Sequence, residues 1–353
     1  MSVLPLGLSE EGEPVRVVVG KDSGGWHERF SAALGVAASK HPTLEYRLEE
    51  LGGHDWIERV RDADVVLWNP VYMGPVAASH FKEKVYFLET FMRKRVIPNY
   101  SSIWHFESKI AQSYLLEHFG LSRPRTWVSF EWNDALGAAE DLGLPLVAKE
   151  SYGAASSNVR LLRTNSEVKR YVTRHLYYQR WLEKEKTASS RTMTLLGSMD
   201  QPWLWYTVVG RLTGSERVHP TYFQRYIEGN AGDVRVTVIG SRAYVFGRAN
   251  RPDDFRASGS GLIDYDLDVD HALLRKCITW SKEMGFDSMA YDILFEDGQP
   301  LVVEMSYSYV ASALAAARGH WLLCDDGTLE YIEGPVWPQD LWVGLALDCT
   351  SSR

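Results

Sequence analysis

The sequence predicts an α/β protein whose N-terminal domain is doubly wound. Short apolar strands alternate with helical patterns over the first hundred residues, which is typical of a parallel sheet covered by helices. Near residue 300 the pattern changes to two alternating strands joined by an Asp-Gly turn, which indicates a β-hairpin. At 353 residues the chain is too long for one simple core, so two or three subdomains are expected.

The composition is that of an ordinary soluble globular protein, with 45% hydrophobic and 24% charged residues. The net charge of −8 argues against a nucleic-acid-binding surface. No apolar run is long enough to span a membrane, and the first residues do not resemble a secretion signal, so no membrane association is expected. The three cysteines lack metal-ligand spacing and are expected to be reduced thiols in a cytoplasmic protein.

The first domain is expected to form strands and helices at residues 15–19, 26–39, 44–48, 55–61, 65–68, 81–95 and 96–99. The loop Gly20–Gly25 follows the first strand, but Trp26 and His27 stand where a phosphate loop requires Lys and Ser or Thr. The dinucleotide fingerprint G-x-G-x-x-G is also absent. We therefore expect this domain to contribute to a substrate site at its strand ends rather than to bind a nucleotide.

Further strands and helices alternate as far as residue 284. Helices are predicted at 104–119, 134–142, 166–186 and 270–284, and strands at 126–130, 144–149, 159–162, 233–239 and 243–248. Residues 187–215 are rich in Thr, Ser and Trp without a clear period, and we interpret them as an inserted element. The tail from about Trp321 shows turn dipeptides but no clear pattern.

The predicted hairpin lies within residues 285–309. Its apolar residues alternate and fall on odd-numbered positions in both arms, which requires a loop of odd length. A three-residue turn with Gly298 in the left-handed conformation satisfies that requirement. The polar residues Asp292, Glu304 and Ser306 then share the opposite face, with Asp292 and Glu304 as diagonal neighbours roughly 7–8 Å apart.

Two carboxylates at this separation repel each other unless a cation lies between them. Mg²⁺ prefers oxygen ligands of this kind, so Asp292 and Glu304 are candidate metal ligands. The alternative is a hairpin whose polar face is simply solvated, and the pair taken alone favours that alternative.

Two lysines and a loop of small residues are candidate phosphate-binding groups. Lys149 ends a buried-type strand, and a buried lysine needs an anion such as phosphate, unless its ammonium reaches solvent at the strand end. Lys109 lies on an amphipathic helix, where an ordinary surface charge is the alternative. The loop that contains Gly153, Ser156 and Ser157 has backbone N–H groups that can close over phosphates, or it is an ordinary loop.

Charged residues gather on one strand and on the segment that follows it. Asp233 and Arg235 share one face of a strand whose other face is valine, and an exposed ion pair is the alternative there. Arg248, Arg251 and Arg256 lie within nine residues, and arginine suits bidentate recognition of carboxylate and phosphate. Of these three, Arg248 and Arg256 are the favoured pair.

From about residue 104 to residue 309 the chain resembles the ATP-grasp superfamily, in its RimK-like branch of carboxylate–amine ligases. The motifs that carry the resemblance, in the family's order, are Leu-Pro-Leu-Val-Ala-Lys149, Phe223-Gln224-Arg225-Tyr226-Ile227, Gly232-Asp233-Val234-Arg235-Val236, Arg248 with Asp254-Phe255-Arg256, and Asp292 with Glu304-Met305-Ser306. The resemblance implies an N-terminal α/β domain at 1–103 and a two-lobed ATP-grasp fold, with lobes at 104–222 and 223–353.

The resemblance also implies a site for ATP with Mg²⁺, or with Mn²⁺ in its place. The residues implied to bind the nucleotide are Lys109, Lys149, Gly153, Ser156, Ser157, Gln224, Tyr226, Ile227 and Asp233. The residues implied to contact phosphate or the acyl intermediate, and hence to be catalytic, are Arg235, Arg248 and Arg256.

The sequence departs from the family pattern at three places. Ser306 stands where the third metal ligand is usually Asn, Ser258 replaces a usual Asn, and the commonly Gly-rich loop has only Gly153. A serine hydroxyl can still contact Mg²⁺ directly or through water. The second metal site of the family is nevertheless expected to be weaker or differently built here.

The implied function is an ATP-dependent ligase that activates a carboxylate as an acylphosphate and joins it to an amine, with release of ADP and phosphate. Two alternatives keep the fold, namely a nucleotide-binding protein without turnover, in a regulatory or scaffold role, and a phosphotransferase. The substrate is expected to be a small molecule or a peptide, and the arginines favour an anionic one. No nucleic-acid or membrane partner is expected, and a homo-oligomer is left open.

Overall fold

The computed structural model describes residues 14–70, 75–106, 108–150, 159–176, 220–251 and 261–348. The chain divides into two compact units: unit 1 comprises residues 1–106 together with 230–353, and unit 2 comprises residues 107–229. The two ends of the chain therefore belong to one unit, and the predicted three-part division at 103 and 222 remains a prediction. None of the helices in the described ranges is long and apolar enough to cross a membrane.

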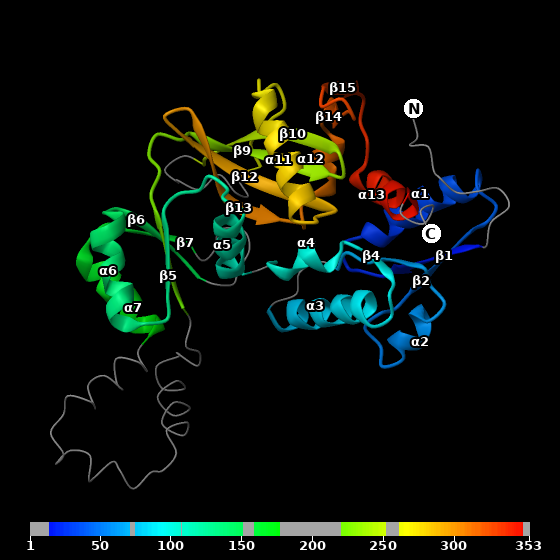
Figure 1. The fold of residues 1–353 in the computed structure, drawn as a ribbon, viewed down its shortest axis with the longest axis horizontal. Coiled ribbons are helices and arrows are strands. Elements are labelled where there is room, and N and C mark those ends of the chain that lie inside the picture. Colours follow the sequence, from blue (N-terminus) through cyan, green and yellow to red (C-terminus); the bar gives the residue numbers. More distant parts are fainter. Residues whose placement is uncertain are drawn as a thin grey trace, which may run out of the picture. The chain divides into compact units, whose positions relative to one another are not determined.

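The first part of unit 1 is a parallel sheet with helices, as predicted (Figure 1). Its elements are β1 (Val15–Gly20), α1 (Trp26–Ala38), β2 (Leu44–Glu49), α2 (Trp56–Val60), β3 (Val65–Leu67), α3 (Pro75–Thr90) and β4 (Arg95–Ile97). The strand order is β2-β1-β3-β4, and every pairing is parallel. Three consecutive valines of β1, Val17 to Val19, are fully buried, because parallel sheets are covered on both faces.

The loop after β1 is closed by a carboxylate of its own. Asp22 accepts hydrogen bonds from the backbone N–H groups of Gly24, Trp26 and His27, at 2.7, 3.2 and 2.9 Å. These N–H groups lie at the N-terminus of α1, where a phosphate would otherwise bind. Asp22 therefore occupies the position at the N-terminus of α1 that an anion would take.

The second part of unit 1 is a larger antiparallel sheet (Figure 1). Its strands are β9 (Gly232–Ile239), β10 (Arg242–Ala249), β11 (Ile263–Asp264), β12 (Ser288–Glu296), β13 (Gln299–Ser306), β14 (Gly319–Leu323) and β15 (Leu329–Glu333). The order is β13-β12-β9-β10-β14-β15, with β11 paired to β10. The helices of this part are α4 (Tyr100–Trp104), α11 (His271–Glu283), α12 (Ala311–Ala315) and α13 (Pro338–Asp348), and α11 packs on β9, β10 and β12.

The last helix, α13, joins the two sheets of unit 1. The fully buried indole of Trp342 lies 5.0 Å from the ring of Trp26 and 6.0 Å from that of Phe30, both on α1. Its Nε1 donates to the hydroxyl of Tyr309 at 3.1 Å. The tail without a clear sequence pattern therefore forms β14, β15 and a helix that packs on the N-terminal domain.

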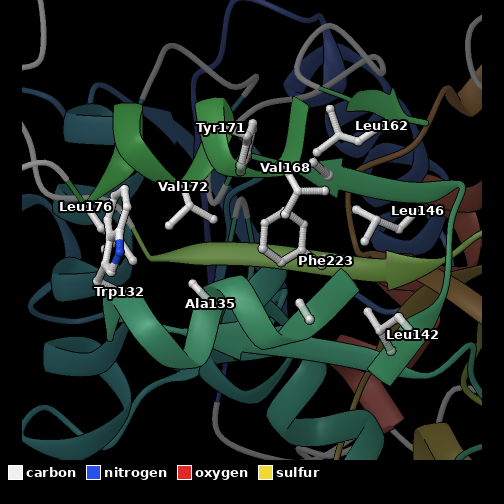
Figure 2. Packing of buried hydrophobic residues seen from close by; sticks show 12 residues of the cluster. Trp132, Ala135, Leu142, Leu146, Leu162, Val168, Tyr171, Val172, Leu176 and Phe223 are labelled. Atoms are coloured by element: carbon white, nitrogen blue, oxygen red, sulfur yellow. The ribbon is translucent and has the colours of Figure 1, made fainter. Parts of the chain in front are cut away.

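Unit 2 is a small antiparallel sheet with helices. Its elements are α5 (Lys109–His118), β5 (Thr126–Ser129), α6 (Trp132–Leu142), β6 (Leu146–Lys149), β7 (Val159–Leu162), α7 (Asn165–His175) and β8 (Thr221–Arg225). The strand order is β5-β8-β6-β7. Figure 2 shows Phe223 of β8 among apolar side chains of α6 and α7, including Ala135, Val168 and Val172, all of them buried. This core holds both helices against one face of the sheet.

The single helix predicted at 104–119 was wrong. The chain forms two helices instead, because α4 ends at Trp104 and α5 begins only at Lys109. The side chain of Ser108 accepts the N–H of Ala111, a cap that starts a new helix. The helix predicted at 166–186 is confirmed for Asn165–His175, and residues 177–186 lie outside the described ranges.

Candidate active site

The hairpin of β12 and β13 has a tighter turn than predicted. Glu296 pairs with Gln299, so only Asp297 and Gly298 connect the strands. Both have positive φ, 50° and 75°, as this two-residue turn requires. The predicted three-residue turn was therefore wrong.

A β-bulge at Val303 adds one residue to β13, and this extra residue has the effect on the strand register that we had expected from an odd-length loop. Ile293 pairs with Val302, whereas Asp292 pairs with Glu304, so Val303 is the extra residue of β13 at the bulge. Asp292 and Glu304 are consequently direct cross-strand partners, and the prediction of a diagonal pair was wrong. Direct partners share one face of the sheet, with Cβ atoms about 4.5–5.5 Å apart. The two candidate ligands are thus attached closer together than expected.

Asp292 belongs to a chain of ion pairs across three adjacent strands. β9 lies between β12 and β10, and its register places Arg235 opposite Asp292 and Asp233 opposite Arg248. Arg235 donates from Nε and Nη2 to the two oxygens of Asp292 at 2.7 and 2.8 Å. Arg248 donates in the same way to Asp233 at 2.7 and 2.5 Å, and its Nη2 also lies 2.7 Å from Oδ2 of Asp292. We call these four residues, whose charges sum to zero, the Asp–Arg cluster.

The Asp–Arg cluster is buried, with side-chain exposures of 5% for Asp292 and 8% for Arg248. Burial alone would raise the pKa of Asp292, but the guanidinium groups of Arg235 and Arg248 outweigh it and hold that pKa below its usual range. Burial, together with the charge of Asp292, raises the pKa of Asp233 to about 6. Asp292 therefore keeps its negative charge to a lower pH than Asp233 does, and both carboxylates are mainly ionised at neutral pH.

The hairpin face that carries Asp292 and Glu304 suits a divalent cation that is also coordinated by oxygen atoms of a bound ligand. Ser306 pairs with Ala290 and so lies on the face of Asp292 and Glu304. Its hydroxyl donates to the carbonyl of Ser308 at 2.7 Å and accepts from the N–H of that residue at 3.2 Å. No group of three or more His, Cys, Asp or Glu side chains placed to hold a metal occurs in the described ranges. Since Mg²⁺ is commonly held by one or two carboxylates together with phosphate oxygens, the pair suits that mode of binding.

Unit 2 contains two buried lysines. Lys149 is the last residue of β6 and only 8% exposed, and its Nζ lies 5.7 Å from the ring centre of Tyr222, its cross-strand partner. Lys109 is the first residue of α5 and 9% exposed, which contradicts the alternative of an ordinary surface charge. Burial of an ammonium group favours an anionic partner for each lysine.

Three of the residues that the resemblance implies for nucleotide binding, Gln224, Tyr226 and Ile227, lie at the end of β8 or directly after it. By that resemblance they would contact the adenine. Gln224 is buried, and its Nε2 donates to Oγ1 of Thr126 at 3.3 Å and to the hydroxyl of Tyr222 at 3.4 Å. Tyr226 and Ile227 follow the last residue of the strand, the former half-buried and the latter buried. The contact of these residues with adenine remains a prediction.

A network that anchors the end of β6 was not predicted. The hydroxyl of Tyr171 donates to the carbonyl of Lys149 at 3.1 Å. Nε2 of His175 lies 2.9 Å from Oε2 of Glu150, and its Nδ1 lies 2.8 Å from the carbonyl of Tyr171. α7 thereby holds the strand end that positions Lys149. The i, i+4 spacing of Tyr171 and His175 on a predicted helix was the available signal.

Several predicted site residues lie outside the described ranges, so their roles remain predictions. They are Gly153, Ser156, Ser157, Arg256 and Ser258, together with the insert at 187–215.

Solved structures share this fold over most of the chain. D-cycloserine synthetase DcsG aligns with a TM-score of 0.57 at 14% identity, over 95% of this chain and 99% of that one. D-alanine–D-alanine ligase from Bacillus anthracis, complexed with ATP, aligns with a TM-score of 0.56 at 14% identity, over 97% and 99%. A RimK-domain ATP-grasp protein from Sphaerobacter thermophilus aligns with a TM-score of 0.52 at 14% identity, over 85% and 93%.

The chain has the ATP-grasp fold. The fold class predicted from the sequence is thereby confirmed, including the α/β region that precedes the two ATP-grasp lobes in the prediction. No protein-family model and no curated protein sequence matches the chain. At 14% identity the likeness shows the ATP-grasp fold and no more, so the chemistry has to be argued from the residues of this chain.

Proposed function

We propose that this ATP-grasp chain is an ATP-dependent, ADP-forming ligase that activates a carboxylate as an acylphosphate and joins it to an amine. One observation carries the proposal: Asp292 and Glu304 are direct partners, and Arg235 and Arg248 contact Asp292. One face of the sheet thus holds both carboxylates that can bind a cation and arginines that can bind the anionic oxygens of phosphate or carboxylate. Catalysis of phosphoryl transfer rests on this combination of positioning and charge neutralisation.

The similar structures support ATP as a substrate and a small molecule or peptide as the acceptor. D-alanine–D-alanine ligase has been solved with ATP, and the ATP-grasp ligase PsnB with a minimal precursor, at a TM-score of 0.56 and 14% identity to this chain. The arginines of the cluster favour an anionic substrate group.

Asp292 and Glu304, with Ser306 beside them, are the residues that would hold Mg²⁺ or Mn²⁺. The cation, when bound, would neutralise phosphate charge. Arg235 and Arg248 would contact the transferred phosphoryl group or the acyl group. Asp233 would orient Arg248 through the bidentate bond between them, in addition to the nucleotide contact that the resemblance implies for Asp233.

The remaining roles follow from the resemblance and from burial. Lys109 and Lys149, buried in unit 2, would bind phosphate oxygens. The small residues Gly153, Ser156 and Ser157 would close over the phosphates. The residues proposed for adenine are Gln224, Tyr226 and Ile227, and Arg256 is proposed as a further catalytic arginine.

An ADP-release assay tests the proposal. Wild-type protein with ATP and Mg²⁺ is screened against a panel of carboxylates paired with amines, and ADP formation should require both partners. Lys149→Met, which removes the ammonium but keeps an unbranched side chain of similar length, should abolish the signal. Absence of ADP formation with every pair would contradict the ligase proposal.

A second candidate is a nucleotide-binding protein without turnover. It is favoured by the engagement of both Asp292 oxygens with arginines and of the Ser306 hydroxyl with Ser308. Thermal stabilisation follows RT ln(1 + [L]/Kd), about 2.7 kcal/mol at a hundredfold excess of ligand over Kd. Stabilisation by ATP with Mg²⁺ but no ADP release under any condition would favour this candidate.

We also propose a cytoplasmic location. Cys277 and Cys324 are both free thiols, and Cys277 is buried. Reduced cysteines are typical of proteins in a reducing compartment.

A further inference from the structure

The carboxylate of Asp292 already accepts three donors within the chain. Oδ1 accepts from Nε of Arg235, and Oδ2 accepts from Nη2 of Arg235 and contacts Nη2 of Arg248. A carboxylate offers about four lone-pair positions. A cation at Asp292 therefore competes with the arginines both for oxygen lone pairs and for the negative charge.

The two arginines differ in what they would lose by leaving Asp292. Arg235 would break both of its bonds to that carboxylate. Arg248 would break one contact and keep its bidentate bond to Asp233, whose two oxygens lie 2.7 and 2.5 Å from Nε and Nη2. Arg248 is thus the arginine that can be displaced while its charge stays paired.

We propose that Arg248 is an exchangeable counter-ion of the candidate metal site: it neutralises Asp292 while the site holds no cation, and Asp233 retains it once a divalent cation binds. Arg248 is in this respect a positioning residue that sets the metal affinity of the chain through Asp292. The inference rests on the proposed metal role of Asp292 and Glu304, but not on the ligase reaction.

The charge balance predicts the sign of the effect. Without Arg248, the carboxylates of Asp233 and Asp292 share one remaining arginine of the cluster, Arg235. Buried carboxylates with too little counter-charge are costly, and a bound divalent cation reduces that cost. Arg248→Met should therefore bind a metal more tightly than the wild type, whereas loss of a purely structural arginine should weaken or not affect metal binding.

The experiment measures Mn²⁺ binding to the full chain without nucleotide, by the electron paramagnetic resonance signal of free Mn²⁺. In Arg248→Met the Kd for Mn²⁺ should fall at least about tenfold, which corresponds to about 1.4 kcal/mol. The melting temperature of this variant should be below that of the wild type without metal, and Mn²⁺ should raise it by more than it raises the wild-type value.

Three variants test the cause. Arg248→Lys keeps the positive charge and should leave the Mn²⁺ affinity near the wild-type value. Asp233→Asn removes the carboxylate that retains Arg248, so the arginine stays on Asp292 and the Mn²⁺ affinity should fall. Asp292→Asn in the Arg248→Met background should abolish the gain.

Arg95→Met is the control for the loss of a partly buried, ion-paired arginine elsewhere in unit 1. Arg95 forms an ion pair with Asp287 in the same unit, with Nη2 2.5 Å from Oδ1. This variant should be destabilised, and Mn²⁺ should not restore its stability beyond the shift seen in the wild type.

The inference is overturned if Arg248→Met binds Mn²⁺ no more tightly than the wild type, if Arg95→Met gains as much, or if no variant binds Mn²⁺ up to about 10 mM, far above the usual range for a site that functions in cells. Because no nucleotide or substrate is present, these outcomes are separate from the ADP-release assay. A ligase with no gain in Arg248→Met would keep its proposed function and lose this inference.

Discussion

The two sheets of unit 1 differ in which side chains their strands carry on each face. β1 in the parallel sheet has three consecutive buried valines, Val17 to Val19, so it is apolar on both faces along this stretch. β9 in the antiparallel sheet has Val236 and Val238 on one face and Asp233 and Arg235 on the other. The stretch of β1 that is apolar on both faces serves as scaffold, whereas β9 carries charges on one face, where they pair with charges of the neighbouring strands.

The same contrast holds for the carboxylates. Asp22, after β1, accepts from three backbone N–H groups, which every residue except proline provides, and it also contacts Nδ1 of His27. Asp292, on β12, is satisfied by guanidinium groups of neighbouring strands. Backbone donors are fixed in place, but side-chain donors can move to another partner. We therefore expect substitutions in the parallel sheet and its helices to change mainly stability. Substitutions in the Asp–Arg cluster and the hairpin should change mainly activity.

The largest effect is expected in the scaffold. Trp342→Ala removes a fully buried indole that packs on Trp26 and Phe30. It should lower the free energy of unfolding by about 3–5 kcal/mol, measured by urea denaturation. Trp321→Ala, at a half-buried position of β14, is the control and should cost less. A loss below about 1 kcal/mol in Trp342→Ala would show that α13 does not hold the two sheets together.

The next effect concerns the site and should leave the scaffold intact. Glu304→Gln keeps the shape of the side chain and removes the charge opposite Asp292. ADP formation should fall at least about a hundredfold, or about 2.7 kcal/mol, with the free energy of unfolding within about 0.5 kcal/mol of wild type. Glu330→Gln, on the exposed edge strand β15 of the same sheet, should change neither quantity. Unchanged ADP formation in Glu304→Gln would remove the hairpin from the active site.

The smallest effect is a dependence of stability on pH at the contact between the sheets. Burial raises the pKa of Glu89 to about 7, opposed by the N–H of Tyr100, which donates to both carboxylate oxygens. Because the folded pKa lies above the unfolded value, this group stabilises the fold fully at pH values below the unfolded pKa, and the contribution is lost as the pH rises through about 7.

Glu89→Gln remains neutral at every pH. It should therefore be more stable than wild type by on the order of 1 kcal/mol near pH 8, after allowance for solvent screening, and nearly equal to it near pH 4.5. Urea denaturation at the two pH values measures the difference, with Glu83→Gln, an exposed position of the same helix, as the control. A gain that is independent of pH would assign the effect to packing rather than to ionisation.

Local patterns were enough to predict the elements that define the fold. The alternation of strands and helices predicted the parallel sheet, and period-two alternation placed Asp292, Glu304 and Ser306 on one face. The turn was wrong because an odd-length loop and a two-residue turn with a bulge at Val303 give the same parity. The sequence pattern alone does not distinguish an odd-length loop from a two-residue turn followed by a bulge.

The pairing of strands that are far apart in the sequence could not be predicted from the sequence alone. The position of β9 between β12 and β10 brings Asp233 to Arg248 and Arg235 to Asp292. From the sequence, these residues were interpreted one by one, either as solvated charges or by the roles that the resemblance implies, and their pairing was not predicted. The docking of Trp342 on α1 joins residues more than three hundred positions apart. Such contacts depend on tertiary packing, for which one sequence carries no periodic signal.

Unit 1 is built from both ends of the chain, with unit 2 between them, and this order has a consequence for synthesis on the ribosome. The residues of unit 2 are contiguous and emerge together, so unit 2 can fold while synthesis continues. The first sheet, in contrast, emerges with Trp26 and Phe30 of α1 uncovered, because Trp342 is translated last among these three. A nascent chain therefore carries an apolar surface on α1 from the synthesis of Phe30 until that of Trp342, and chaperones that bind such surfaces have that interval in which to act.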